Sequence, residues 1–232
     1  MDISQLKKEA GVKACQMVES GMTLGVGTGS TVAYFIEELG RRHKEEGLWA
    51  HCVPTSIRSA EALKKAGLEV CDIDKVGRID LTVDGADAVD PDLNGLKGLG
   101  GALLWEKIVA ENTDHYVWIV DESKLVPSLR GKVCLEVVKF GSAKLLKELE
   151  ECGLNPSFKQ GENGPALTDS SNYLIELDLG EIKDPAFLAT DLKQRTGVIE
   201  HGMFLGMVDE VVVAKESGIE IIKKSHRLKR MA

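Results

Sequence analysis

Residues 23–31 read Thr-Leu-Gly-Val-Gly-Thr-Gly-Ser-Thr. The pattern predicts a short strand over 23–26, a glycine turn over 27–30 and a helix over 31–39 that ends at Gly40. In such a turn the glycines let the backbone approach a ligand closely, and the free N–H groups at the helix start attract anions. We expect a cradle for a phosphate or a polyol, with a tight turn that holds no ligand as the alternative.

Two familiar nucleotide motifs do not fit this turn. Ser30 occupies the position of the third glycine in the dinucleotide fingerprint, and the next predicted strand ends in Pro54-Thr55-Ser56 rather than in an acidic residue. A P-loop would need a lysine after its last glycine, and none follows Gly29. The hydroxyls of Thr55 and Ser56 lie at the start of the next helix, and by themselves they indicate an ordinary N-cap.

A helix precedes this stretch, and strands and helices alternate after it, which predicts a parallel sheet. The expected strands of the first part are 50–53, 68–71, 79–83 and 116–120, and its expected helices are 3–19, 56–66 and 101–111. After Pro127 we expect a small α+β unit with strands 133–140, 173–179 and 197–199 and helices 143–152 and 185–195. Strands 211–214 and 219–222 then return to the first sheet. The predicted domains are therefore 1–128 with 206–232, and 129–205.

Composition limits the classes of function. The chain has 232 residues and a formal charge of -8, which disfavours a nucleic-acid partner, and the basic cluster over 223–230 is expected to be a solvated terminus. A membrane partner is also not expected, because no stretch approaches the about 18 apolar residues of a spanning helix. The N-terminus lacks a secretory signal, so we expect a cytoplasmic protein with its five scattered cysteines reduced.

Carboxylates crowd the loop after the strand that ends at Val83. Asp84, Asp87, Asp90 and Asp92 lie within nine residues, and such carboxylates repel one another unless they are solvated, bind a metal or face a polar substrate. The spacing does not match a calcium loop. Asp84 and Asp87 are expected at the ligand edge of the sheet, and a solvated acidic turn is the alternative.

Two lysines and one glutamate complete the candidate site. Lys97 precedes glycines at 98, 100 and 101, and Glu106 lies on a partly apolar face of the following helix, where desolvation would raise its pKa. A carboxylate in such a position can move protons, but an exposed helix charge fits the pattern as well. Lys124 follows a buried strand, where a surface loop is the alternative.

Taken in order, six segments resemble the ribose-5-phosphate isomerase A family over nearly the whole chain. They are GVGTGST (25–31), TSIRS (55–59), DGADAVD (84–90), LKGLGGALLWEK (96–107), DESK (121–124) and GVIEHGMF (197–204). The resemblance implies an α/β fold, with a Rossmann-like large domain built on a mostly parallel sheet and a smaller α+β, ferredoxin-like domain. It also implies an isomerase of the pentose phosphate pathway that interconverts ribose 5-phosphate and ribulose 5-phosphate through a cis-enediolate, without metal or other cofactor.

The resemblance also assigns roles to single residues. Glu106 would be the base that moves a proton between C1 and C2, and Lys97 would stabilise the developing oxyanion. Asp84 and Asp87 would assist ring opening and bind sugar hydroxyls. The remaining substrate-binding residues would be Thr28, Gly29, Ser30, Thr31, Gly98 and Gly100, with Lys7 and Lys124 as contacts of the phosphate. A homodimer or a dimer of dimers is expected.

The chain departs from the usual family pattern at Arg58, Ala88, Leu99 and Trp105, and none of these removes a proposed catalytic group. Two other functions compete with the isomerase. A sugar-phosphate sensor would bind without turnover, although Lys97 and Glu106 are both present. An enzyme of another class on a similar fold, such as a CoA transferase or a sugar-phosphate deaminase, would catalyse a different reaction. A CoA transferase would use a carboxylate as nucleophile and form a thioester adduct, which incubation with an acyl-CoA would reveal.

Overall fold

The structure is a computed structural model that describes residues 2–224. By their contacts these residues divide into two compact units. The first unit comprises 2–85, 109–124 and 206–224, and the second comprises 86–108 and 125–205. Residues 86–108 thus join the second unit by contact, whereas the sequence-based division placed them in the large domain. The predicted domain boundaries themselves stay a prediction, and Arg227, Lys229 and Arg230 of the basic cluster lie outside the described residues.

Among its described residues, the first unit contains a mostly parallel seven-stranded sheet. The order of the strands is β16-β15-β7-β4-β1-β2-β3. Every neighbouring pair is parallel except β15 with β16. The strands are β1 (Thr23–Val26), β2 (His51–Pro54), β3 (Glu69–Val70), β4 (Ile79–Asp84), β7 (Thr113–Asp121), β15 (Glu210–Lys215) and β16 (Gly218–Lys223). This sheet confirms the predicted α/β class.

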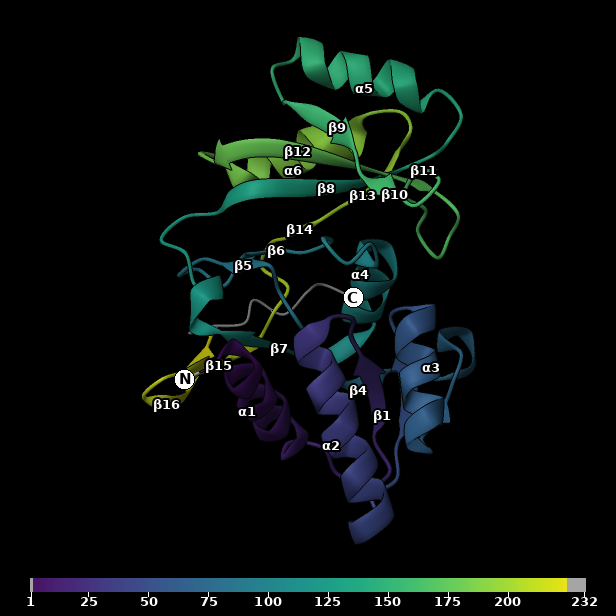
Figure 1. Cartoon of the computed structure of the whole chain (residues 1–232), viewed down its shortest axis with the longest axis vertical. Helices are drawn as coiled ribbons and strands as arrows, with labels where there is room; N and C mark the ends of the chain where they lie inside the picture. Colours follow the sequence, from purple (N-terminus) through teal and green to yellow (C-terminus); the bar gives the residue numbers. More distant parts are fainter. Residues whose placement is uncertain (1, 225–232) are drawn as a thin grey trace. The chain divides into compact units, whose positions relative to one another are not determined.

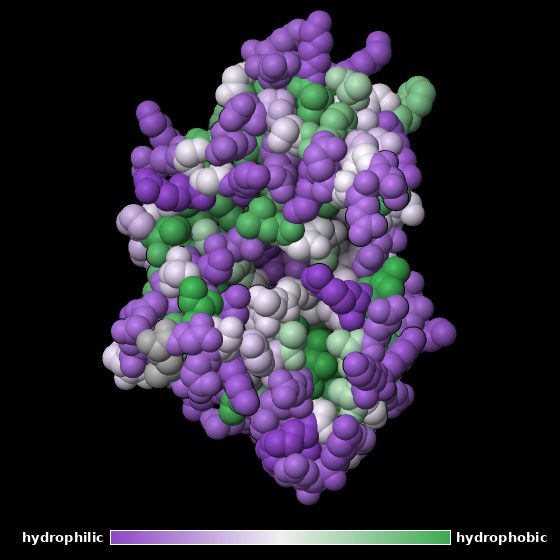
Figure 2. All heavy atoms as spheres, in the orientation of Figure 1, coloured by the Kyte–Doolittle hydropathy of each residue, from purple (hydrophilic) through white to green (hydrophobic). Residues whose placement is uncertain are grey.

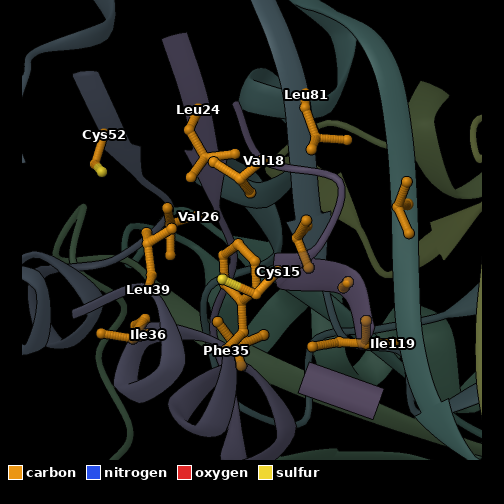
Figure 3. Close-up of a cluster of buried hydrophobic side chains, with 14 of the residues drawn as sticks. Cys15, Val18, Leu24, Val26, Phe35, Ile36, Leu39, Cys52, Leu81 and Ile119 are labelled. Carbon is orange, nitrogen blue, oxygen red and sulfur yellow. The ribbon is translucent and has the colours of Figure 1, made fainter. Parts of the chain in front are cut away.

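Three helices of the first unit, α1 (Ile3–Cys15), α2 (Ser30–Glu46) and α3 (Ile57–Ala66), lie side by side along the sheet (Figure 1). Figure 3 shows Phe35, Ile36 and Leu39 of α2 turned toward Leu24 and Val26 of β1. These side chains are at most 5% exposed, and their burial is the main driving force for packing α2 on the sheet.

Helix α2 does not end at Gly40 as predicted from sequence, but continues to Glu46. A Cβ atom at position 40 would lie 2.8 Å from Cβ of Ala66, so the glycine permits close packing of α2 on α3. Tertiary contact therefore outweighs the low helix propensity of this residue. Beside this crossing, Figure 2 shows a patch of apolar residues over α2 and α3, flanked by hydrophilic ones; Ala33, Ile36 and Ala62 line it.

The second unit has a four-stranded antiparallel sheet in the order β13-β8-β12-β9. Its elements are β8 (Arg130–Val137), α5 (Ser142–Glu151), β9 (Pro156–Phe158), β12 (Tyr173–Glu181), α6 (Pro185–Gln194) and β13 (Val198–His201), with a hairpin of β10 (Gln160–Gly161) and β11 (Gly164–Pro165). This βαββαβ order with antiparallel pairing is the ferredoxin-like arrangement that was expected. Leu145 and Leu149 of α5 and Leu192 of α6 are buried in the core of this unit, so both helices pack through their apolar faces.

Short pairings complete the second unit. The two-residue strands β5 (Ala88–Val89), β6 (Gly95–Leu96) and β14 (Met203–Phe204) form a small antiparallel sheet that the sequence patterns did not predict. Helix α4 (Leu103–Glu111) follows β6 in the chain; it begins in the second unit and ends in the first. No helix among the described residues is long and apolar enough to cross a membrane, and all five cysteines are free thiols.

Candidate active site

Polar residues follow the carboxyl ends of neighbouring strands in the first unit. Strand β1 leads into Gly27 and Thr28, β2 into Thr55, and β4 ends at Asp84. Because β1 connects toward β2 on one side while β4 lies on its other side, the sheet order reverses here. Open α/β sheets bind ligands at such a reversal, outside the carboxyl ends of the strands.

Asp84 is fully buried and holds the glycine turn. Its Oδ1 atom accepts hydrogen bonds from the backbone N–H of Thr28 at 3.1 Å and of Gly85 at 2.8 Å, and Oδ2 accepts one from the Tyr116 hydroxyl at 3.2 Å. A side chain at Gly27 would overlap the Asp84 carboxylate, so only glycine fits at that position. The turn and the aspartate are therefore fixed to each other, as expected for two parts of one site.

A cluster of hydroxyls surrounds Thr28. Its Oγ1 atom lies 2.8 Å from Oγ1 of Thr55, 2.8 Å from Oγ of Ser56 and 3.1 Å from Oγ of Ser59, and Ser59 donates to the carbonyl of Gly27 at 2.7 Å. Ser56 is also the N-cap of α3, as the alternative interpretation of this motif held. The cap and the support of Thr28 are thus the same group of side chains.

Gly29 and Ser30 lie exposed at the start of α2, where Gly29 is the N-cap with a φ of 134°. The Lys7 ammonium group donates to Oγ of Ser30 at 3.0 Å, so a cation is held beside a helix N-terminus. Both features attract an anion. Lys124 lies in the 3₁₀ turn η2 (Glu122–Lys124) that follows β7 in the same unit.

In the second unit the structure brings Lys97 and Glu106 together. The distance from Nζ of Lys97 to Oε2 of Glu106 is 3.4 Å, and the two side chains are 3% and 5% exposed. Glu106 lies in the first turn of α4, and the alternative of an exposed helix charge is wrong. Burial and the nearby ammonium group act on this carboxylate in opposite directions, so the expected rise of its pKa stays a prediction.

The glycine loop between these residues is tightly packed. Gly98 has a φ of 111°, and a Cβ atom there would lie 2.8 Å from Leu103 and 2.9 Å from Cys134. The exposed residues Leu99 and Gly100 follow. The backbone N–H of Leu99 donates to Oδ2 of Asp87 at 3.1 Å, so Asp87 fixes the loop that carries Lys97.

Lys107 is a functional candidate that sequence reasoning missed. It is buried, and its ammonium group donates to Oε1 of Glu200 at 2.8 Å and to the carbonyls of His201 at 2.6 Å and Met203 at 3.1 Å. The ring of Phe204 lies 4.8 Å from Nζ of Lys107. These partners are in the GVIEHGMF segment (197–204), whose residues had no predicted role.

The Lys107 network shifts two ionisation equilibria. Burial lowers the pKa of His201 to about 4, and the Lys107 ammonium group, 3.4 Å from Nδ1, acts in the same direction. Although burial raises the pKa of Glu200, the charge of Lys107 and the hydrogen bonds from Lys107 and Lys193 lower it to about 2. At neutral pH the network is therefore a lysine cation, a glutamate anion and a neutral histidine.

The network also reaches the backbone of Lys97. The carbonyl of Gly202, between two residues held by Lys107, accepts the backbone N–H of Lys97 at 2.8 Å. The Phe204 ring centroid lies 5.5 Å from Nζ of Lys97. Lys107 thus braces the segment against which Lys97 is positioned.

Two of the remaining predicted features have structural roles. Asp90 closes its own loop, because Oδ1 accepts the backbone N–H groups of Asp92 and Asn94. Trp105, a departure from the family pattern, donates from Nε1 to Oγ of Ser170 at 2.9 Å. Neither arrangement disturbs the Lys97–Glu106 pair.

Comparisons with known proteins agree on one family. The family model described as ribose 5-phosphate isomerase A (phosphoriboisomerase A) matches residues 51–218. The ribose-5-phosphate isomerase A of Streptococcus agalactiae serotype V is 50% identical over 223 residues, covering 96% of this chain and 100% of that protein. That of Streptococcus thermophilus LMD-9 is 49% identical, covering 95% of this chain and 99% of that protein.

Solved structures give the same result. A D-ribose-5-phosphate isomerase in complex with phospho-erythronic acid has a TM-score of 0.92 and 34% identity, covering 96% of this chain and 100% of that chain. The ribose 5-phosphate isomerase A of Methanocaldococcus jannaschii has a TM-score of 0.91 and 34% identity, with the same coverage.

Proposed function

The chain belongs to the ribose 5-phosphate isomerase A family of the pentose phosphate pathway, and from this premise we propose that Glu106 is the base of its isomerisation and Lys97 the stabiliser of the intermediate. The single observation that carries the proposal is the buried pair of Lys97 and Glu106, 3.4 Å apart. A carboxylate and an ammonium group are the two chemical functions that the reaction needs.

The reaction is a balanced shift of hydrogen within one open-chain sugar. Glu106 removes the proton from C2 of ribose 5-phosphate, the electron pair forms the C1–C2 double bond of a cis-enediolate, and the carbonyl oxygen O1 becomes negative. The protonated Glu106 returns its proton to C1, while the proton of O2 ends on O1, which gives ribulose 5-phosphate. Proton transfer by a positioned carboxylate contributes typically about 10²- to 10⁴-fold.

Lys97 supplies positive charge where the enediolate oxygen develops. A preorganised donor of this kind contributes about 3 to 4 kcal/mol to the stabilisation of an oxyanion. Burial supports this role, because the interaction between charges is stronger where water is excluded. The ring of Phe204 beside Nζ and the backbone hydrogen bond to Gly202 support a fixed position for the ammonium group.

The remaining site residues are proposed as substrate contacts. Asp84 and Asp87 would bind sugar hydroxyls and assist ring opening. The phosphate would contact Lys7 and Lys124. Residues of the two glycine-containing turns would hold the sugar phosphate through backbone N–H groups and hydroxyls. They are Thr28, Gly29, Ser30 and Thr31 in the first turn, and Gly98 and Gly100 in the second.

The test of the base uses Glu106→Gln with Glu111→Gln as a matched control, since Glu111 is an exposed carboxylate at the end of the same helix. We expect Glu106→Gln to lower kcat by about 10²- to 10⁴-fold with little change in KM. Glu111→Gln should match the unmodified chain. Conversion of ribose 5-phosphate is measured in excess chelator, and a Glu106→Gln variant with normal kcat would assign the base to another residue.

A second measurement addresses substrate binding. One structural relative was solved with phospho-erythronic acid, so this compound is the probe for the present chain. We expect it to inhibit competitively and to bind Glu106→Gln as well as the unmodified chain. Two further expectations stay predictions: a homodimer or dimer of dimers, which light scattering would measure, and a location in the cytoplasm.

A further inference from the structure

Three side chains that the isomerase chemistry does not use meet at the outer edge of the seven-stranded sheet. His51, Glu69 and Cys71 each offer one metal-ligating atom, and these atoms all lie within 4.8 Å of one another. The His51 and Glu69 side chains are 41% and 62% exposed, and Cys71 is half-buried. The cluster is therefore accessible from solvent and partly shielded by the sheet.

Strand geometry explains why these residues meet. Parallel pairing of β2 with β3 sets His51 opposite Glu69, and the N–H of Cys71 continues the ladder by donating to the carbonyl of Cys52 at 2.8 Å. Residues 69 and 71 are two apart, so their side chains lie on the same face of the sheet. Cys52 points to the opposite face, into the main core, where it is fully buried.

The distances among the three side chains are near those around a tetrahedral ion. Nδ1 of His51 lies 3.0 Å from Oε2 of Glu69, and Sγ of Cys71 lies 3.7 Å from Oε1 of Glu69 and 3.9 Å from Nδ1 of His51. Zinc bonds of about 2.0 to 2.3 Å in a tetrahedron separate the ligand atoms by about 3.3 to 3.6 Å. The two Glu69 distances involve different oxygens, and with one ligand atom from each residue all separations stay within 4.8 Å. Rotation of the exposed His51 and Glu69 side chains would therefore complete the coordination.

The kinds of donor select the class of ion. One imidazole nitrogen, one thiolate and one carboxylate are typical zinc ligands, whereas calcium and magnesium prefer sites made of oxygen atoms. The rings of Trp49 and His51 pack in a T-shaped arrangement with centroids 5.6 Å apart, which restricts the imidazole. We propose that His51, Glu69 and Cys71 bind one zinc-class divalent cation, with solvent as the fourth ligand.

Binding would have a cost and a structural consequence. Burial and the neighbouring Glu69 carboxylate raise the pKa of the Cys71 thiol, so an ion must displace its proton. The ion would join β3, an edge strand of only two residues, to β2 through side chains as well as backbone. Because the ion would bind the folded chain, it would raise Tm by roughly 5 to 10 °C at a free concentration of about 100 times Kd.

The test is a titration of the full chain, stripped with chelator, with CoCl₂ as a spectroscopic probe and ZnCl₂ as a competitor. We expect one Co²⁺ per chain, a thiolate-to-cobalt charge-transfer band, tetrahedral visible bands, and loss of all of them on addition of Zn²⁺. The variants Cys71→Ser and His51→Gln should each lose the tetrahedral spectrum and weaken binding by about tenfold or more.

Cys152→Ser is the matched control, because Cys152 is an exposed thiol elsewhere that lies 3.6 Å from Arg195. This variant should keep the full cobalt spectrum. A charge-transfer band that is absent from the unmodified chain, or that survives in Cys71→Ser, would overturn the proposal, and the first result needs no variant to fold. Isomerase activity should be the same with and without Zn²⁺, so the metal site and the proposed catalytic residues are tested separately.

Discussion

Removal of one charge from the Lys97–Glu106 pair should destabilise the folded chain as well as stop catalysis. At 3.4 Å, with the effective dielectric constant of about 20 that suits protein sites, the attraction between the two charges is about 5 kcal/mol. Both side chains are at most 5% exposed, so water screens the pair little. Removing one partner of such a buried pair costs typically about 3 to 5 kcal/mol, because the other charge stays buried and loses this attraction.

Three variants separate the pair from its surroundings: Lys97→Met, Glu106→Gln, and both changes together. Each single change should lower the unfolding free energy by about 3 to 5 kcal/mol and Tm by roughly 6 to 20 °C. The double variant should be more stable than either single one, because it buries no unmatched charge of the pair. All three should lose most of their turnover, since each lacks a group needed for proton transfer or for oxyanion stabilisation.

The assays are thermal and urea unfolding together with kcat, measured below the lowest Tm of the set. Additive losses in the double variant would show that the two charges do not interact in the folded chain. That result would remove the electrostatic basis of the proposed site. Full turnover in the double variant would remove its chemical basis as well.

Three smaller perturbations test other parts of the structure. Because the pKa of His201 is about 4 when folded and about 6.5 when unfolded, the unfolded chain binds more protons between these values. The contribution of His201 to the free energy of unfolding should be fully present above pH 6.5 and should fall by on the order of 3 kcal/mol toward pH 4. In urea unfolding, His201→Gln should lose this dependence of the unfolding free energy on pH. An unchanged pH dependence in this variant would show that His201 is not its cause. Gly27→Ala should displace the Asp84 carboxylate, lower unfolding free energy by about 1 to 3 kcal/mol and reduce kcat; normal values for both would contradict the close packing. Tyr116→Phe removes a donor to Asp84 and should cost about 1.5 to 3 kcal/mol in urea unfolding, whereas no loss would show that this hydrogen bond adds no net stability.

Most of the fold could be predicted from local patterns in the sequence. The alternation of strands and helices predicted the parallel sheet. Strands of such a sheet are buried on both faces, so they appear in the sequence as continuous apolar runs such as 116–120, which can be recognised without knowledge of the rest of the chain. Capping also follows local rules, and Ser56 is an N-cap as its position indicated. The extension of α2 through Gly40 could not be read in this way, since its cause is Ala66 on another helix.

The candidate site was predictable in part for the same reason. Glu106 could be placed on a partly apolar helix face, and the glycines near Lys97 mark a tight loop. Lys107 was missed because its acceptors are 93 to 96 residues away along the chain, and a lysine beside a glutamate on a helix is usually solvent-exposed. The two-residue strands β5, β6 and β14 are too short to show any periodicity.

The position of β15 in the sheet has a consequence for biosynthesis. Strand β7 pairs with β4 on one side and with β15 on the other, and β15 comes from residues 210–215, which are synthesised well after β4 and β7. Until then β7, with six consecutive buried residues over 116–121, presents an unpaired hydrophobic edge. Such edges recruit strands from other chains, so a nascent chain stalled before residue 210 is a substrate for chaperones or a seed for aggregation.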